Sequence, residues 1–314
     1  ALCNPDGLGY ATCTGQVLPA LESCLAPSDE DCNGQALACT GSELFHKKFG
    51  DAGAQAGAGI AAWNGGAVIA GVFAGTVDFG GGALVSGGAN DAFVASYDYL
   101  GAHQWSKRFG DTVAQAATDV AVDGAGNVYL VADYAGKIDT GGGVQTSAGL
   151  TDIVLVKYDK AGVFQWSKSF GDSKAQNVTG VAVDDAGHVA ITGSFIGDLA
   201  FGGDLLTSAG AATDVFVAVF DSDGGHVWSK RFGDTVAQVG KAIAFGPLGE
   251  VVIAGDLTGT TDFGGGLLTS AGATDVFVAS FDALGAHLWS KAFGNNVAQV
   301  ANGVALDSVG NVVV

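Results

Sequence analysis

The sequence has 314 residues, of which 48% are apolar and 14% are charged, so the chain is long and apolar enough to bury a large core. Acidic residues outnumber basic residues by 32 to 13 and give a net charge of −19, which excludes nucleic acid and anionic membrane surfaces as favoured partners. No apolar run reaches the roughly 18 residues that span a bilayer, so no membrane insertion is expected. The chain has no Met and no visible signal peptide, and we expect it to be a mature or truncated product.

Residues 1–43 form a cysteine-rich leader. Five cysteines crowd into a short segment that also contains Gly, Pro and Asp, which indicates disulfides and an oxidising compartment. A zinc site is the alternative, although the leader has no CxxC pair and no His. Because five is an odd number, either one thiol is free or its partner lay upstream of Ala1. The cysteines are Cys3, Cys13, Cys24, Cys32 and Cys39.

The leader also carries a candidate metal motif. Asp29, Asp31 and Asn33 have the D-x-D-x-N-G spacing of the first half of a Ca²⁺ loop, in which alternate side chains converge on one ion. The second half is absent, because Thr40 stands where a bidentate Glu would be. The sequence therefore predicts a Ca²⁺ site in a disulfide-framed loop completed by backbone carbonyls and Glu22, with an acidic solvated turn as the alternative.

The rest of the chain repeats itself. The strings LFHKKFGD, QWSKRFGD, QWSKSFGD, VWSKRFGD and LWSKAFGN place Phe45, Trp105, Trp166, Trp228 and Trp289 in register, at intervals of 60 to 62 residues. Such a period is typical of architectures in which each unit buries its apolar faces against its neighbours. A residue that recurs in every unit is then expected to serve the fold.

The repeats are expected to occupy residues 44–314. The predicted parts are a terminal strand at 44–50, full units at 51–110, 111–171, 172–233 and 234–294, and a partial unit at 295–314.

Each unit contains signals for four antiparallel strands and none for a helix. In the unit 111–171 the predicted strands are Val120–Val122, Asn127–Ala132, Asp152–Tyr158 and Val163–Phe170. The third strand is a continuous apolar run, which predicts burial on both faces. The first strand has smaller side chains, as expected where sheets converge on an axis.

Repeated four-stranded units predict an all-β fold of the β-propeller type. A parallel β-helix is the main rival, but its coils are much shorter than 61 residues and lack the Asp-x-x-Gly hairpins seen here. The terminal strand and the partial unit leave one blade without its third strand, so we expect the natural chain to continue beyond Val314. One further segment of about 40 residues would close a five-bladed ring.

The repeat W-S-K-x-F-G-D-x-x-A-Q…V-x-V-D-x-x-G-N-V…T-S-A-G-x-T-D-V-F-V-A resembles the SBBP-type β-propeller repeats of predicted secreted and surface proteins of myxobacteria and related bacteria. The leader, at residues 13–41, is similar to the cysteine-rich, metal-linked motif of MopE-like proteins. Together the two resemblances cover nearly the whole chain, and they imply an extracellular propeller with a metal-linked leader.

The recurring polar and aromatic residues favour structural roles. Aspartates at turn starts, and the Asp/Gln pairs of G-D-x-x-A-Q, are expected to bind backbone N–H groups, with a ring of metal sites as the alternative. The Trp series is expected to pack between sheets, with sugar-stacking platforms as the alternative. His103, His226 and His287 occupy equivalent places and form no triad. Trp63 breaks the repeat and is predicted to be the one aromatic exposed for binding.

No catalytic motif or unique pair of carboxylates appears, so the chain is predicted not to be an enzyme. We expect a secreted or cell-surface β-propeller scaffold that binds a protein or glycan, mediates adhesion or acts as a spacer. The alternative is an extracellular filament or matrix protein that forms homo-oligomers through strand exchange at its terminal blade. A carbohydrate-active enzyme is the third hypothesis.

Overall fold

A computed structural model describes residues 45–314. In this part of the chain all regular structure is β, with 26 strands and no helix, and therefore no helix that could cross a membrane. Residues Lys48–Val314 form one compact unit that contains every strand. The predicted all-β class is confirmed.

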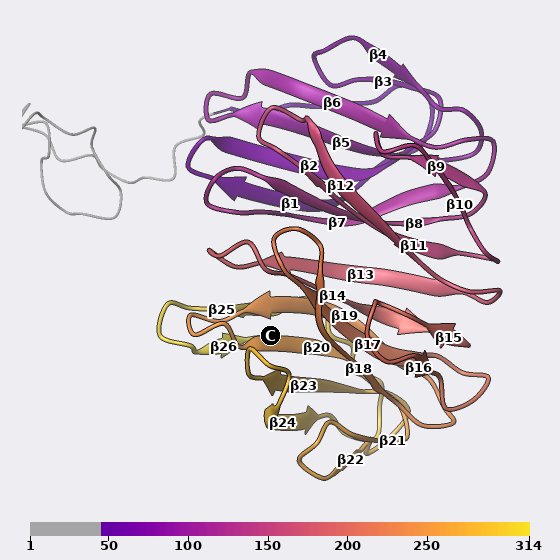
Figure 1. Cartoon of the computed structure of the whole chain (residues 1–314), viewed down its shortest axis with the longest axis vertical. Helices are drawn as coiled ribbons and strands as arrows, with labels where there is room; N and C mark the ends of the chain where they lie inside the picture. Colours follow the sequence, from indigo (N-terminus) through magenta and orange to yellow (C-terminus); the bar gives the residue numbers. More distant parts are fainter. Residues whose placement is uncertain (1–44) are drawn as a thin grey trace, which may run out of the picture. The chain divides into compact units, whose positions relative to one another are not determined.

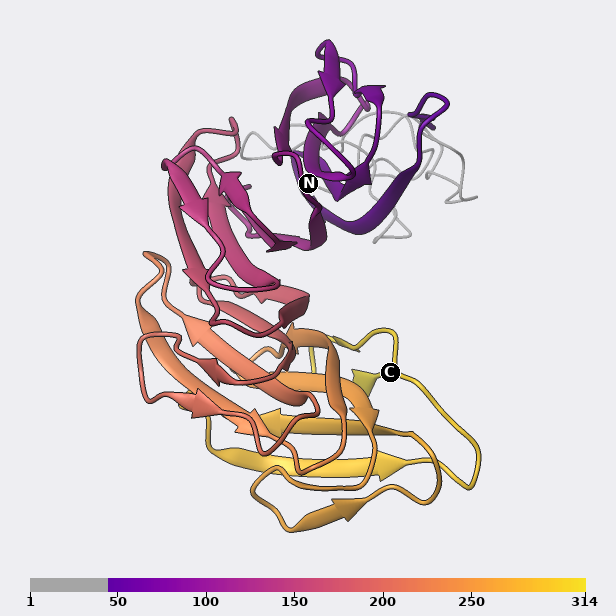
Figure 2. The same cartoon turned by 90° about the vertical axis from the view of Figure 1, so that its right-hand side faces the viewer.

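Four antiparallel four-stranded sheets follow one another in chain order (Figures 1 and 2). The first sheet consists of β1 (Gln55–Trp63), β2 (Gly66–Phe73), β5 (Asp91–Asp98) and β6 (His103–Phe109). The second consists of β7 (Gln115–Val122), β8 (Val128–Tyr134), β11 (Asp152–Tyr158) and β12 (Phe164–Phe170). The third consists of β13 (Gln176–Val183), β14 (Val189–Phe195), β17 (Asp214–Phe220) and β18 (His226–Phe232). The fourth consists of β19 (Gln238–Phe245), β20 (Val251–Leu257), β23 (Asp275–Phe281) and β24 (His287–Phe293).

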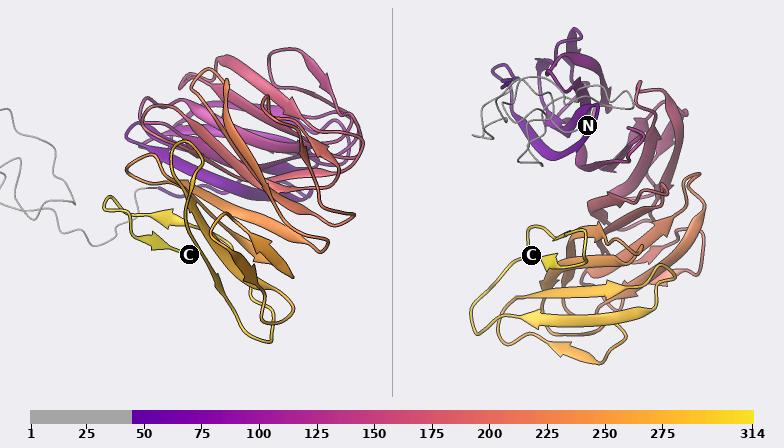
Figure 3. Two further views of the ribbon diagram at one scale, coloured as in Figure 1. Left: turned by 60° about the horizontal axis from the view of Figure 1, so that its bottom comes forward. Right: turned by 90° about the vertical axis from the view of Figure 1, so that its left-hand side faces the viewer.

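A short hairpin, β25 (Ala305–Leu306) with β26 (Val312–Val313), follows the fourth sheet, and β25 lies against β19 (Figure 3). This hairpin is the expected beginning of a partial unit. In the described chain, no strand of the first sheet pairs with the fourth sheet or with this hairpin. The closed ring therefore stays a prediction.

The Gly-rich links contain structure that the sequence analysis did not predict. Each link between the second and third strand of a sheet folds into a two-stranded hairpin beside the main sheet. The glycines that follow the first short strand, such as Gly141 and Gly143, have φ of 114° and 105°, a region that side chains with a Cβ avoid. The hairpins are β3–β4 (Thr76–Asp78, Ala83–Val85), β9–β10 (Lys137–Asp139, Val144–Thr146), β15–β16 (Asp198–Leu199, Leu206–Thr207) and β21–β22 (Thr260–Asp262, Leu267–Thr269).

The first strands of successive sheets lie against one another, as the small side chains of these strands predicted. Each of β1, β7, β13 and β19 carries a bulge in its middle, where the register against the second strand shifts by one residue. A bulge increases local twist and bend, which suits the strand at which neighbouring sheets converge.

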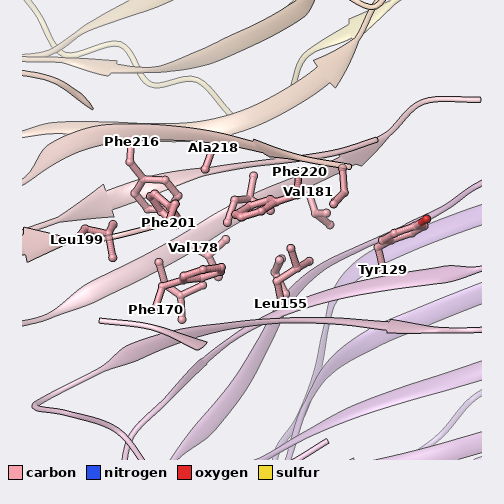
Figure 4. Close-up of a cluster of buried hydrophobic side chains, with 14 of the residues drawn as sticks. Tyr129, Leu155, Phe170, Val178, Val181, Leu199, Phe201, Phe216, Ala218 and Phe220 are labelled. Atoms are coloured by element: carbon pink, nitrogen blue, oxygen red, sulfur yellow. The ribbon is translucent and has the colours of Figure 1, made fainter. Parts of the chain in front are cut away.

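The third strands are buried on both faces, as predicted. In β11, Ile153 and Leu155 pack toward the third sheet, while Val154, Val156 and Tyr158 pack toward the first. The core between the second and third sheets is made from side chains of both (Figure 4). At about 25 cal/mol per Å² of apolar surface, these layers supply most of the folding free energy.

The predicted terminal strand at 44–50 is wrong for the part that the structure describes, because residues 45–50 form no strand. A fourth strand needs a third strand beside it, and no sheet precedes the first one in the described chain. Phe49 nevertheless stacks on Tyr97, with 5.6 Å between ring centroids, as Phe109 stacks on Tyr158 at 6.1 Å. The packing of the repeat Phe on the following sheet is thus kept without the strand.

Candidate functional site

The Asp/Gln pair of each repeat ties a loop together. Asp111 accepts hydrogen bonds from the N–H of Val113, from Nε2 of Gln115 and from the N–H of Lys137. Gln115 in turn accepts the N–H of Asp111 and donates to the carbonyl of Ala135. The hydrogen bond from Val113 is the largest of several that hold the pKa of Asp111 below its usual range. The same contacts recur in the third and fourth sheets, so the pair is scaffold, as predicted.

The aspartates at turn starts also serve the backbone. Asp159 Oδ1 accepts the N–H groups of Ala161 and Val163, and Gly162 adopts a φ of 77°. Equivalent contacts form at Asp98, Asp123, Asp184, Asp221, Asp282 and Asp307. Because these oxygens are occupied by their own turns, a ring of metal sites at these aspartates is not supported.

A third set of aspartates, at the starts of the third strands, explains the glycine of the repeated Phe-Gly motif. Asp152 is buried, and its Oδ2 accepts the N–H of Ala148. A Cβ built on Gly171 would lie only 2.3 Å from Cγ of Asp152, so the carboxyl group occupies the space of the missing side chain. Burial raises the pKa of Asp152. In the first and third sheets, Arg108 and Arg231 pair with the equivalent aspartates.

The repeat Trp residues join each sheet to the next. Trp105, Trp166 and Trp228 donate their indole N–H groups to the carbonyls of Lys160, Ser222 and Ala283, in the next sheet's turn. Packing between sheets is therefore confirmed, although the hydrogen bonds reach 55 or 56 residues along the chain and are not local.

Trp63 is half-buried and lies against the following sheet, which corrects the prediction that it is exposed for binding. A Cβ built on Gly126, in the first turn of the second sheet, would lie 3.0 Å from Nε1 of Trp63. The equivalent histidines also pack locally. The Nε2 atoms of His103, His226 and His287 lie 3.0 to 3.1 Å from the hydroxyls of Ser106, Ser229 and Ser290.

Two partly buried carboxylates bind the second sheet to the third. Asp133, on β8, accepts hydrogen bonds from the side chain of Asn177 and from the N–H of Val178, as Asp256 in the fourth sheet accepts the N–H of Ala301. Asp119, at the bulge of β7, has no counterpart in the other sheets and accepts the N–H of Val181 on β13. Burial raises the pKa of each carboxyl to about 6.

One hollow lies where the copies of the repeat differ most. It has a volume of about 600 Å³ and opens between the first turns of the third and fourth sheets. We call it the rim hollow. Its apolar wall includes Val219, Phe245 and Leu248, and Leu248 is 89% exposed. Its lining has carboxyl groups and His188 but neither Lys nor Arg. The full lining is Val183, Asp184, Asp185, Ala186, His188, Val219, Val227, Phe245, Gly246, Pro247, Leu248, Gly249, Val251, Ala283, Leu306, Asp307 and Ser308.

The turn 246–250 that forms one wall departs from the repeat. Gly246 replaces the Asp that starts the equivalent turns, and the carboxyl of Glu250, at the other end of the turn, accepts the N–H of Leu248. Pro247 and Leu248 stand where the equivalent turns have Gly124-Ala125, Asp185-Ala186 and Ser308-Val309. The backbone of this turn is thus held by a carboxyl group at its last residue and not at its first. Leu248 is exposed at the mouth of the hollow.

The polar pair in the rim hollow belongs to a turn and not to a catalytic centre. Nδ1 of His188 lies 2.8 Å from Oδ2 of Asp184. In the second sheet and in the terminal hairpin, Asn127 and Asn311 make the same contact through their amide groups. Because His188 stands where an Asn suffices elsewhere, its hydrogen bond with Asp184 stabilises the turn.

A larger hollow of about 840 Å³ lies between the fourth sheet and the terminal hairpin. Trp289, Phe293 and Val300 are among its lining residues. Phe293 is 53% exposed, whereas its equivalents in the first three sheets are 4% to 7% exposed. The hollow therefore lies on the face of the fourth sheet that is equivalent to the face which the first three sheets bury against their neighbours. We interpret it as a surface for packing between sheets.

The predicted Ca²⁺ ligands Asp29, Asp31 and Asn33, like the five cysteines, lie outside the described residues. Within residues 45–314 no three His, Cys, Asp or Glu side chains come together as a metal site.

The rim hollow was missed by the sequence analysis. A signal was available: aligned against the other copies, the segment 246–250 loses its Asp and gains Pro247 and the exposed Leu248. What the alignment of copies could not show is which side chains face this turn from the third sheet.

No protein-family model matches the chain. Over 187 residues it is 33% identical to regulatory protein FlaEY of Caulobacter vibrioides, in a match that covers 54% of this chain and 19% of that protein. Over 185 residues it is 24% identical to an uncharacterized WD repeat-containing protein of Acanthamoeba polyphaga mimivirus, covering 50% of this chain and 13% of that protein. The chain thus spans less than a fifth of either relative. Among solved structures, a protein of unknown function from Bacteroides caccae aligns with 79% of this chain and 85% of that chain, at 8% identity and a TM-score of 0.36.

Proposed function

We propose that this protein is a non-enzymatic scaffold at the cell surface or outside the cell, and that it holds a partner at the rim hollow. The observation that carries the proposal is the contrast between recurring and non-recurring residues. The recurring Asp, Gln and Trp side chains are engaged in turns and sheet junctions, whereas Pro247 and Leu248 are not repeated and project beside an open hollow.

The lining of the hollow suits recognition better than chemistry. Ligand sites are concave and mostly apolar, with a few polar groups that fix orientation, and the volume of about 600 Å³ lies in their usual range. The hydrogen bond between Asp184 and His188, both lining residues, belongs to the turn. The names of the two relatives, one regulatory and one with WD repeats, are in keeping with an interaction protein.

The acidic composition and the cysteine-rich leader support the extracellular setting of this proposal. We retain Ca²⁺ as the proposed ligand of Asp29, Asp31 and Asn33, because their spacing provides hard oxygen donors.

A peptide-display library panned on the full-length protein tests the proposal. Peptides enriched on the wild type should bind the variant Leu248→Ser about fivefold or more weakly, since one exposed apolar anchor at the mouth is lost. The matched control is Leu284→Ser, because Leu284 is 82% exposed in the equivalent turn of another hairpin and lies outside the hollow. A protein that enriches no peptide, or peptides that are indifferent to Leu248→Ser, would contradict the proposal.

A second candidate function, end-to-end assembly of copies, is favoured by the exposed faces of the outer sheets. Ile60 on β1 is 73% exposed, whereas its equivalents Val120, Val181 and Ile243 are 4% to 7% exposed because a preceding sheet covers them. Phe293 is exposed on the opposite face of the fourth sheet. The two faces are therefore the partners that adjoining sheets normally bury together.

Absolute molar mass from light scattering tests this second candidate. The wild type should form dimers or longer oligomers, and the variant Phe293→Asp should be monomeric. A wild type that stays monomeric at all concentrations would remove assembly from consideration and leave the scaffold proposal intact.

A further inference from the structure

We infer that the rim hollow binds a primary ammonium group carried on an apolar body, either a small aryl- or alkylamine or the lysine side chain of a partner. This inference rests on the proposed function in one respect, namely that the rim hollow is a binding site. It adds the chemical class of the ligand, which we infer from the side chains that lie between successive sheets elsewhere in the protein.

The first two junctions between sheets are filled by side chains of the preceding sheet. At the junction of the first and second sheets, Trp63 reaches Gly126 of the next turn, as described above. At the junction of the second and third sheets, the phenol of Tyr129 reaches Gly187 of the next turn. A Cβ built on Gly187 would lie 3.5 Å from the phenol oxygen. Tyr129 is fully buried there.

The third junction lacks such a side chain. The strand registers place Ala190 where the second sheet has Tyr129, since Ala182 pairs with Ala190 as Ala121 pairs with Tyr129. A Cβ built on Gly249, the equivalent turn glycine, would have one neighbour within 4 Å, the Cβ of Ala283 in its own sheet. Ala190 itself is fully buried in the core cluster against which Phe245 packs, and the lining of the rim hollow includes Phe245 but not Ala190.

A cation is missing from the third junction as well. In the second sheet, Nζ of Lys157 lies 5.1 Å from the centroid of the Tyr129 ring and donates to the carbonyl of Ser222 at 2.9 Å. This carbonyl also accepts the indole N–H of Trp166. In the third sheet the residue equivalent to Lys157 is Val219.

The acceptor in the third junction is nevertheless kept. The carbonyl of Ala283, equivalent to that of Ser222, accepts the indole N–H of Trp228 at 3.1 Å, and Ala283 is among the lining residues of the hollow. A carbonyl oxygen has two lone pairs, so it can accept an ammonium N–H in addition. The carboxyl groups of Asp184, Asp185 and Asp307 in the lining add a negative potential that favours a cation over an anion.

By analogy with Tyr129 and Lys157, we expect the ligand to have two parts. Its ammonium group donates to the turn carbonyl, and its apolar body packs on the apolar wall of the hollow. Tyramine combines both groups in one molecule and is the first probe. Tyrosol, which has a hydroxyl in place of the ammonium, is the matched neutral probe. A blocked lysine, Nα-acetyl-lysine methylamide, represents the side chain of a protein partner.

The readout is the indole N–H resonance of Trp228 in the ¹⁵N-labelled full-length protein. Tyramine should shift this resonance in a saturable manner with a Kd on the order of 1 mM, as expected for a ligand of this size. The resonance of Trp166 should stay in place, because Lys157 already occupies the equivalent carbonyl. Tyrosol should bind about tenfold or more weakly, since it lacks the charged hydrogen bond.

The variant Val219→Lys places an ammonium in the hollow from within, and Trp228 should then no longer respond to tyramine. The variant Val309→Lys adds the same charge at a residue that is 78% exposed and outside the lining, so its response should equal that of the wild type. The unchanged Trp166 resonance shows in each case that the protein is folded. If Val219→Lys does not fold, Ala186→Lys, which adds the same charge from an exposed lining residue, takes its place.

Three results would overturn the inference: no shift of Trp228 with tyramine or with the blocked lysine, equal affinity for tyramine and tyrosol, or an undiminished response in the filled variant. Tighter binding of the blocked lysine would assign the ammonium to a protein partner, and tighter binding of tyramine would assign it to a small amine. Display peptides that depend on Leu248 but contain no lysine would exclude the lysine side chain of a partner as the ligand and support the proposed function.

Discussion

The substitution Asp133→Asn is expected to stabilise the protein at neutral pH. Asp133 is partly buried between the second and third sheets, where its two oxygens accept hydrogen bonds from Asn177 and Val178. These bonds lower the pKa of the carboxyl, but burial outweighs them and raises it from 3.8 to about 6. The introduced amide has the same shape, and its oxygen can accept the N–H of Val178. A rotation of the Asn177 amide then supplies an oxygen to the new NH₂ group.

The magnitude follows from the two pKa values. Above pH 6 the carboxyl is ionised in both the folded and the unfolded chain, and the folded state bears the cost of burying the charge. As the pH falls from 6 toward 3.8, the folded protein binds a proton that the unfolded chain does not, so its stability rises. A shift of about two units corresponds to about 3 kcal/mol. Asp133→Asn should therefore raise the free energy of unfolding by up to about 3 kcal/mol at pH 7.5 and by little at pH 4.

Urea denaturation of both proteins between pH 4 and pH 7.5 measures the difference at each pH. Contributions that both proteins share cancel in this difference, including that of His226, whose burial lowers its pKa and so acts in the opposite direction. The variant Asp119→Asn is the contrast. The pKa of Asp119 is also about 6. However, both oxygens of Asp119 accept backbone N–H groups, from Val120 and Val181, so the NH₂ group of an introduced Asn would face another donor. A pH-independent difference for Asp133→Asn, or a loss of stability at pH 7.5, would refute the reasoning.

Three further changes test the roles given to recurring residues and to the leader. Gly171→Ala should lower the free energy of unfolding, measured by urea denaturation, by about 1–3 kcal/mol, because the new Cβ meets the carboxyl of Asp152. Gly124→Ala, where the new Cβ has nothing within 4 Å, should be neutral or slightly stabilising. Equal effects of the two substitutions would contradict the packing argument. Trp166→Phe should cost about 1–2 kcal/mol by removing the indole hydrogen bond to the next sheet, and an unchanged unfolding free energy would show that this bond contributes nothing. Millimolar Ca²⁺ should raise the unfolding temperature of the wild type but not of Asp31→Ala, measured by calorimetry; the same response in both proteins would exclude Asp31 as a ligand.

The sequence predicted the sheets well because their signals are local. The continuous apolar run of Asp152–Tyr158 gave the bounds of β11, and the turn 159–162 gave the start of β12 to within one residue. The first strand was predicted too short, at Val120–Val122, because β7 begins at Gln115 in a polar and small-residue segment. That segment forms a strand because it pairs with β8 and lies against the first strands of the neighbouring sheets, and these contacts are tertiary and not local in sequence.

The errors have a similar origin. The repeated Phe45–Phe49 segment has the sequence of a fourth strand, but a strand needs a partner, and residues 45–50 have none in the described chain. Trp63 was expected to be exposed because it breaks the repeat. It is half-buried because the turn of the following sheet lies against it, and no single unit of sequence contains that information.

The candidate site illustrates the same limit. The loss of the turn Asp and the gain of Pro247 and Leu248 are visible in the sequence. What the sequence does not show is that Val219, in the lining of the hollow, occupies the position that Lys157 fills one sheet earlier. That Tyr129 and Lys157 face the next sheet's turns becomes apparent only from their hydrogen bonds.

The most direct test of the account is a crystal structure of the full-length protein with tyramine. We expect the ammonium to lie within hydrogen-bonding distance of the Ala283 carbonyl, with the ring against Phe245 in the rim hollow. Tyramine bound elsewhere on the protein, or a rim hollow that contains only water at saturating tyramine, would contradict it.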